Sequence, residues 1–138
     1  MAKKTTTITK MYDDLVTALS GVVDKGSIFA GGRPDVKKAN LDTMTKYIVA
    51  ELPVGIEDVA IGNRKFLLNT TGIFYLFTKA KSNMTFNVNA LSDLTEEVTD
   101  LFPISGKYIA ATNPVVLMRG VDEYGYQIVT VTFDVHTH

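Results

Sequence analysis

The stretch FYLFTKAKSNMTFNVNALSDL (residues 74–94) decides how this chain divides into strands and helices. It opens with a run of apolar and aromatic residues, turns polar, and closes in an amphipathic pattern. The apolar run extends back to residue 72, so residues 72–79 have apolar side chains on both faces of a strand, which is typical of a central strand. The stretch therefore predicts a strand, a polar loop and a helix in direct succession.

Two amphipathic helices are expected, each with one apolar stripe at helical spacing. The second begins after the polar loop, where Asn87 or Asn89 can cap its first turn, and Pro103 disfavours its continuation. Its stripe comprises Ala90, Leu91, Leu94, Val98 and Leu101. The first spans residues 8–23 and presents Ile8, Met11, Tyr12, Leu15, Val16, Leu19, Val22 and Val23.

Further strands are predicted on both sides of the central one. Residues 45–52 are β-branched and aromatic, and Gly62-Asn63 between two apolar arms indicates a two-residue hairpin that pairs Val59 with Phe66. Residues 107–112 and 114–121 are expected as two strands, followed by a turn at residues 122–125.

The closing strand, residues 126–138, alternates between apolar and polar side chains, which predicts one buried face and one wet face. The buried set is Val129, Val131, Phe133 and Val135, and the wet set is Thr130, Thr132, Asp134 and His136.

The order of these elements predicts an α+β fold in a single domain, residues 1–138. Short turns between successive strands favour a mostly antiparallel sheet, and the two amphipathic helices are expected to cover one of its faces.

Composition excludes several classes of protein. The chain of 138 residues is 46% hydrophobic and contains no cysteine, which fits a packed core and excludes disulfide and thiolate sites. A net charge of −1 lacks the basic excess of a dedicated nucleic-acid binder. No apolar run is long enough for a membrane span, and the lysines near the N-terminus have no apolar segment behind them, so we expect neither a membrane anchor nor a secretory signal.

The sequence offers few catalytic patterns. It contains no G-x-S-x-G, and AGGRPDVKKAN (residues 30–40) lacks the spacing of a phosphate-binding loop. Asp13-Asp14 and Glu96-Glu97 are adjacent on helices, point in different directions, and are interpreted as solvated faces. Asp134, His136 and His138 share one face of the last strand and could bind zinc, although a polar strand end is the simpler interpretation. No cofactor is expected.

Three segments are candidates for contacts with other proteins. The loop at residues 79–86 is either a flexible contact arm or an ordinary connection between strand and helix. The hairpin tip near residue 63 and the long connection at residues 24–44 are the other two. The candidate contact residues are Arg33, Pro34, Asn63, Arg64, Lys79, Lys81, Asn83 and Met84.

Several of these patterns occur together in one known group of proteins. RP at residues 33–34 precedes YIVAEL at residues 47–52, and residues 74–103 join an apolar strand, an asparagine-rich loop and a helix ending in LFP. The chain closes with DEYGYQIVTVTFDVHT at residues 122–137. From residue 8 to residue 137 this order resembles the tail terminator (tail completion) and head-to-tail connector proteins of tailed bacteriophages.

The resemblance implies a structural protein of the virion without catalytic residues. Such proteins form homo-oligomeric rings of about six copies, or alternatively about twelve, at the top of the tail or between portal and tail. They join head to tail or stop tail assembly, they contact portal, connector or tail-tube proteins, and DNA passes through the lumen. The protein would be made in the host cytoplasm and would reside in the virion.

Two other interpretations remain open. The first is a small α+β enzyme or ligand- or metal-binding domain, with a site between Asp134, His136 and the connection at residues 24–44. The second is an interaction module that binds a host protein by strand addition at the edge of the last strand.

Overall fold

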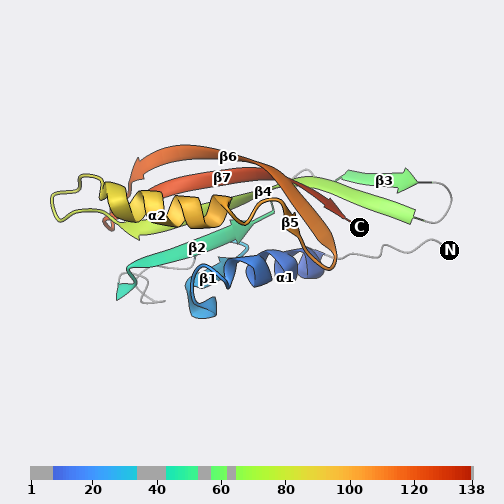
Figure 1. Cartoon of the computed structure of the whole chain (residues 1–138), viewed down its shortest axis with the longest axis horizontal. Coiled ribbons are helices and arrows are strands. Elements are labelled where there is room, and N and C mark those ends of the chain that lie inside the picture. The colour runs from blue at the N-terminus through green and yellow to red at the C-terminus, as the bar shows by residue number, and fades with distance from the viewer. Residues whose placement is uncertain (1–7, 34–42, 53–56, 62–64, 138) are drawn as a thin grey trace.

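A computed structural model describes residues 8–33, 43–52, 57–61 and 65–137 of the chain. In chain order its elements are α1 (Ile8–Leu19), the 3-10 turn η1 (Lys25–Ser27), β1 (Ile28–Ala30), β2 (Lys46–Glu51), β3 (Glu57–Ile61), β4 (Lys65–Lys79), α2 (Val88–Thr99), β5 (Ile104–Ser105), β6 (Ile109–Val121) and β7 (Tyr126–Thr137) (Figure 1). Two helices and a sheet give the α+β class that the sequence predicts.

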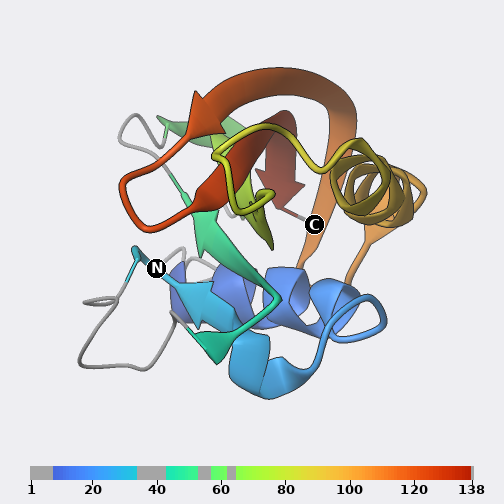
Figure 2. The same cartoon turned by 90° about the vertical axis from the view of Figure 1, so that its left-hand side faces the viewer.

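Within the described residues, seven strands form one sheet in the order β1-β2-β4-β7-β6-β5, with β3 also paired to β4. All neighbours are antiparallel except β1 and β2, which are parallel. The sheet curls into a half-barrel, with α1 below it and α2 at its right-hand side in the view of Figure 2. No helix in the described part of the chain is long and apolar enough to cross a membrane.

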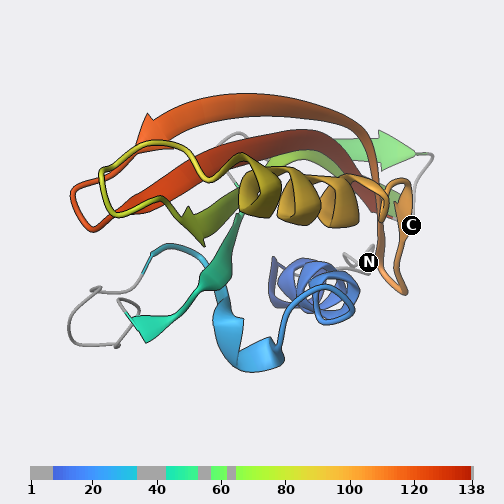
Figure 3. The same ribbon diagram turned by 60° about the vertical axis from the view of Figure 1, so that its left-hand side comes forward.

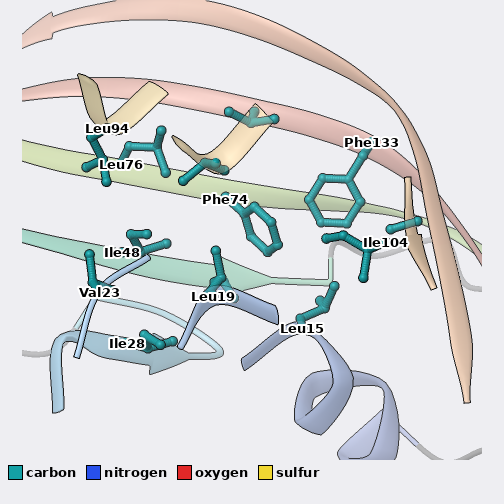
Figure 4. Packing of buried hydrophobic residues seen from close by; sticks show 14 of the residues in the cluster. Leu15, Leu19, Val23, Ile28, Ile48, Phe74, Leu76, Leu94, Ile104 and Phe133 are labelled. Carbon is teal, nitrogen blue, oxygen red and sulfur yellow. The ribbon is translucent and has the colours of Figure 1, made fainter. Parts of the chain in front are cut away.

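The main core lies between the helices and one face of the sheet, which we call the helix face. Met11, Leu15 and Leu19 of α1 and Leu94 and Val98 of α2 enter the same cluster of buried side chains. Strands β2, β4 and β7 supply the opposite wall, including Ile48, Phe74, Leu76 and Phe133 (Figure 4). The i, i+4 spacing of the helix residues aligns them on one side, which is why both helices can bury their apolar stripe in the same core.

A second cluster lies on the opposite face of the sheet, which we call the aromatic face. Tyr47, Val49, Phe77 and Tyr126 are buried there. The rings of Tyr47 and Phe77 are stacked with centroids 4.4 Å apart. Strands β2 and β4 thus bury side chains on both faces, as the continuous apolar run at residues 72–79 predicts.

The central strand is longer than the sequence indicates. The predicted hairpin arm and the predicted central strand are one strand, β4, whose pairing with β7 runs without interruption from Asn69 to Lys79. The predicted pairing of Val59 with Phe66 is wrong by one residue, because Ala60 lies opposite Phe66 and Val59 opposite Leu67. The paired ends Ile61 and Lys65 are separated by three residues, whereas the prediction assumed a two-residue turn.

The C-terminal strands also differ from the prediction. Residues 107–112 and 114–121 were expected as two strands, but β6 continues through Asn113 and Pro114, with a register shift between Thr112 and Val115. The shift accommodates one extra residue on β6, as in a β-bulge, while the strand stays paired with β7. The connection at residues 24–44 is more regular than expected, since it contains η1 and β1.

Candidate functional site

Among the strand residues whose burial the structure describes, β6 contains the longest exposed run, residues 113–119. Along its inner edge β6 pairs with β7 from Ile109 to Val121. Along its outer edge it pairs only with β5, at Ala110 and Ala111, and no other described strand lies beyond it. From residue 112 to residue 121 the backbone therefore presents an edge that can accept another strand.

This open edge has apolar side chains on both faces of the sheet. Val115, Val116, Leu117 and Met118 are 59%, 42%, 49% and 55% exposed. Val116 and Met118 lie opposite the core residues Val131 and Val129 of β7 and therefore share the helix face. Val115 and Leu117 lie opposite Thr132 and Thr130 and share the aromatic face.

The middle of this edge lacks the usual protection against strand addition. Natural edge strands are blunted by lysine, proline, bulges or inward-pointing charges. Here Pro114 and a register shift precede the apolar residues, and a second shift follows Met118. The four residues 115–118 between these features are regular, uncharged and apolar. We call residues 112–121 the β6 edge.

A groove between α2 and β6 extends the apolar surface on the helix face. It encloses about 220 Å³. Its lining residues are Val88, Leu91, Ser92, Thr95, Glu96, Val116, Met118 and Val129. Val88, at the start of α2, is 66% exposed at its rim. Large exposed apolar side chains thus continue from the β6 edge to the N-terminal end of α2.

The loop before α2 approaches the end of the β6–β7 hairpin (Figure 3). It closes on itself: the Met84 amide donates to the Lys81 carbonyl, and Thr85 donates to the Asn83 side chain from both its amide and its hydroxyl. Met84 has a positive φ of 65° and is 48% exposed. The predicted contact residues Lys81, Asn83 and Met84 therefore share one exposed, hydrogen-bonded turn. The Lys79 ammonium lies 4.5 Å from the ring centroid of Tyr126.

Arg33 lies on the aromatic face and contacts its own chain. Its guanidinium donates to Asp122 Oδ2 at 2.6 Å and to the Tyr47 hydroxyl at 2.7 Å, and its Cζ lies 4.4 Å from the Phe77 ring centroid. Burial lowers the pKa of Arg33, but the bonds to Asp122 and Tyr47 outweigh it, so that this pKa is raised. Burial also raises the pKa of Tyr47 to about 12, against the opposing effect of Arg33. Arg33 thus ties the segment after β1 to the β6–β7 turn.

Four of the predicted site residues, Pro34, Asn63, Arg64 and His138, lie outside the described residues. Asp134 accepts a hydrogen bond from the Asn113 side chain at 2.9 Å, and His136 is exposed near the end of β7. Among the described residues, no group of three or more His, Cys, Asp or Glu side chains could hold a metal ion.

The structure does not bring the predicted ligand site together in the part of the chain that it describes. Arg33, from the connection at residues 24–44, contacts Tyr126 at the start of β7, whereas Asp134 and His136 lie near the end of that strand. The prediction that β7 offers a free edge is wrong, because β7 lies between β4 and β6. A strand can be added at β6 instead, since an edge depends on strand order and not on position in the chain.

One predicted solvated carboxylate is buried. Asp14 of α1 is only 9% exposed, and its Oδ2 accepts hydrogen bonds from the amides of Tyr108 at 2.6 Å and Ile109 at 2.9 Å. Its neighbour Asp13 is exposed, as are Glu96 and Glu97 of α2. Asp14 is therefore a structural acceptor that fixes the start of β6 against α1.

Thr130 was also expected on a wet face, yet it is only 2% exposed. It lies between Tyr75 of β4 and Leu117 of β6 on the aromatic face, and these larger neighbours cover it.

Comparisons with protein families and with curated proteins found no relative of this chain. None of the protein-family models matches the chain, and no curated protein is significantly similar to it in sequence.

Proposed function

We propose that the protein is a virion structural protein that forms a ring at the head–tail junction or at the top of the tail. In this role it joins head to tail or ends tail assembly, contacts portal, connector or tail-tube proteins, and lets DNA pass through the lumen. The resemblance of residues 8–137 to tail terminator and connector proteins supports this role.

The observation that carries the proposal is the β6 edge. A strand with an open backbone edge and four exposed apolar side chains is a liability for a monomer, and it is retained where a partner covers it. Strand addition combines main-chain hydrogen bonds with side-chain contacts on both faces.

A ring also needs a second, different patch on each subunit, because head-to-tail contacts join unlike surfaces. The exposed loop before α2 offers Met84 and Phe86 for such a contact. Methionine adapts its shape to an irregular partner surface. A net charge of −1 suits a lumen through which DNA moves without being held.

The proposal is tested by the mass of the purified protein and by negative-stain images, alone and with portal or tail-tube complex. We expect rings of about six or about twelve copies with a central hole. Leu117→Lys, which puts a charge at the β6 edge, should abolish them, whereas Thr17→Lys on the exposed side of α1 should not.

If no ring forms with or without these complexes, and phage lacking the protein still produce sealed, joined particles, the proposed function is wrong.

A further inference from the structure

The β6 edge also raises the question of what covers it before a ring forms. We propose that in the unassembled protein β6 pairs antiparallel with β6 of a second copy, about a two-fold axis at Val116. The inference rests on the proposed function only in calling this dimer the form that precedes assembly.

The edge is complementary to itself in this register. With the axis at Val116, this residue lies opposite the partner's Val116 on the helix face. Val115 lies opposite the partner's Leu117 on the aromatic face, and Pro114 opposite the partner's Met118. Every residue of the regular stretch 115–118 then meets an apolar neighbour, which is the arrangement that stabilises antiparallel pairs.

Charge favours the register with the axis at Val116 over the register with the axis at Leu117. With the axis at Val116, the partner's Arg119 lies opposite Asn113, whose side chain donates to the Asp134 carboxylate. Arg119 interacts with Tyr75 on the aromatic face, and Asp134 belongs to the same face, since it is two residues from Thr132. A shift of the axis to Leu117 would instead set the partner's Arg119 against Val115. We therefore expect an ion pair between the partner's Arg119 and Asp134 only with the axis at Val116, and this pair would favour that register.

The apolar area suits a dimer of moderate strength. The exposed parts of residues 115–118 and Val88 amount to a few hundred Å², on the order of the largest apolar patch of an ordinary monomer. A standard interface buries about 800 Å² on each partner. The two-fold axis is perpendicular to the sheet, so both α2 helices lie on the same side, and the grooves between α2 and β6 supply further area.

An isologous dimer of this kind uses the same edge on both copies and closes on itself. It protects the apolar strand from indiscriminate pairing, and it cannot grow into a ring through β6. Ring formation would therefore exchange the β6–β6 contact for a head-to-tail contact, and the dimer would act as the stored form of the subunit.

The mass in dilute solution without portal or tail proteins tests the dimer. Sedimentation equilibrium should give twice the 15.1 kDa of the chain. Leu117→Lys should raise the dissociation constant by at least about tenfold, and Thr17→Lys should leave it unchanged. A wild-type chain that is monomeric at all concentrations, or a dimer unaffected by Leu117→Lys, overturns the inference.

Disulfide trapping tests the register, because the natural chain has no cysteine. In Val116→Cys the two sulfurs face each other across the axis, and mild oxidation should trap a covalent dimer. In Leu117→Cys the two Cα atoms would be roughly 8 Å apart, beyond the reach of about 7 Å for a disulfide. Equal trapping of both variants, or none at Val116→Cys while the protein is dimeric, contradicts the register.

A charge exchange tests the ion pair. Arg119→Asp should weaken the dimer, and adding Asp134→Arg should restore it, since the pair is then reversed. If the double variant does not regain the affinity of the wild-type dimer, Arg119 and Asp134 do not pair across the interface.

These outcomes separate the inference from the proposed function. If the β6–β6 dimer forms but rings never do, the inference holds and the proposed function is wrong. If rings assemble from monomers and no dimer is found at any concentration, the proposed function holds and the inference is wrong.

Discussion

The side chain of Gln127 and the backbone of Asn87 form a reciprocal pair of hydrogen bonds. Oε1 of Gln127 accepts from the Asn87 amide at 2.8 Å, and Nε2 donates to the Asn87 carbonyl at 2.9 Å and to the Thr78 hydroxyl at 2.8 Å. Gln127 is fully buried at the start of β7, and Asn87 caps α2. One amide thus holds the end of the exposed loop and the start of α2 on the sheet.

Replacing this amide should loosen that junction. Gln127→Leu removes the acceptor of the Asn87 amide and one donor to the Asn87 carbonyl, which still accepts from the Leu91 amide. The variant should lower the free energy of unfolding by about 1 to 3 kcal/mol. Urea denaturation measures the loss, and hydrogen exchange should accelerate at Asn87. Asn89→Ala, an exposed amide on the same helix, is the control and should change little. Wild-type stability in Gln127→Leu would show that the pair is unimportant.

Two adjacent aspartates should behave differently. Asp14→Ala leaves the amides of Tyr108 and Ile109 without their acceptor and should cost about 1 to 3 kcal/mol of unfolding free energy. Asp13→Ala, one residue earlier and exposed, should stay within about 0.5 kcal/mol of the wild type. Thermal and urea unfolding of the two variants side by side check this. Equal losses of unfolding free energy in the two variants would mean that the hydrogen bonds accepted by Asp14 do not stabilise the fold.

The close contact between Gly72 and Phe133 should make glycine necessary in β4. A Cβ at Gly72 would run into the ring of Phe133. Gly72→Ala should therefore destabilise the fold by about 1 to 3 kcal/mol. Combining it with Phe133→Leu, which replaces the ring by a smaller side chain, should recover part of this loss. Gly26→Ala, where the added methyl meets nothing within 4 Å, is the matched control. A stable Gly72→Ala would mean that the strands separate easily at this point.

Stability should fall at high pH because of Tyr47. Burial raises the pKa of its hydroxyl to about 12 in the folded chain, compared with 10.0 for an ordinary tyrosine. Between these values the unfolded chain releases a proton that the folded chain keeps, so the contribution is full below about pH 10 and is lost as the pH rises towards 12. Up to about 3 kcal/mol is at stake.

Chemical denaturation across this pH range checks the prediction, with phenolate absorbance as the direct readout. Tyr47→Phe should flatten the decline. The pKa of Tyr75 is also raised, by burial and then by Glu51, so a smaller slope should remain in this variant. An unchanged slope in Tyr47→Phe would assign the decline to other groups.

Local patterns in the sequence predict the elements but not their neighbours. The apolar stripes of α1 and α2, the cap at Asn87 and the central strand follow from spacing and capping chemistry, and the structure contains them. The predicted extension of the first helix to residue 23 is wrong, because α1 ends at Leu19. Strand order is set by contacts between residues far apart in the chain. For that reason β7, although last in sequence, is an inner strand, and β6 is the edge.

The candidate site shows the same limit. An apolar run such as residues 114–118 is normally interpreted as buried, so its exposure is visible only once strand order is known. Asp14 was misjudged because its acceptor role depends on amides more than ninety residues away. Arg33 was predicted as a contact to another protein, and its contacts to Asp122 and Tyr47 of its own chain were not predictable from spacing.

The most direct test of the ring is the mass and shape of the particles that form when the wild-type chain and Leu117→Lys are each mixed with purified portal or tail-tube complex. The proposed function predicts a closed ring of about six or about twelve wild-type copies on that complex and no ring from Leu117→Lys. Wild-type chains that remain unbound, or rings that form equally well from Leu117→Lys, would contradict the central role of the β6 edge.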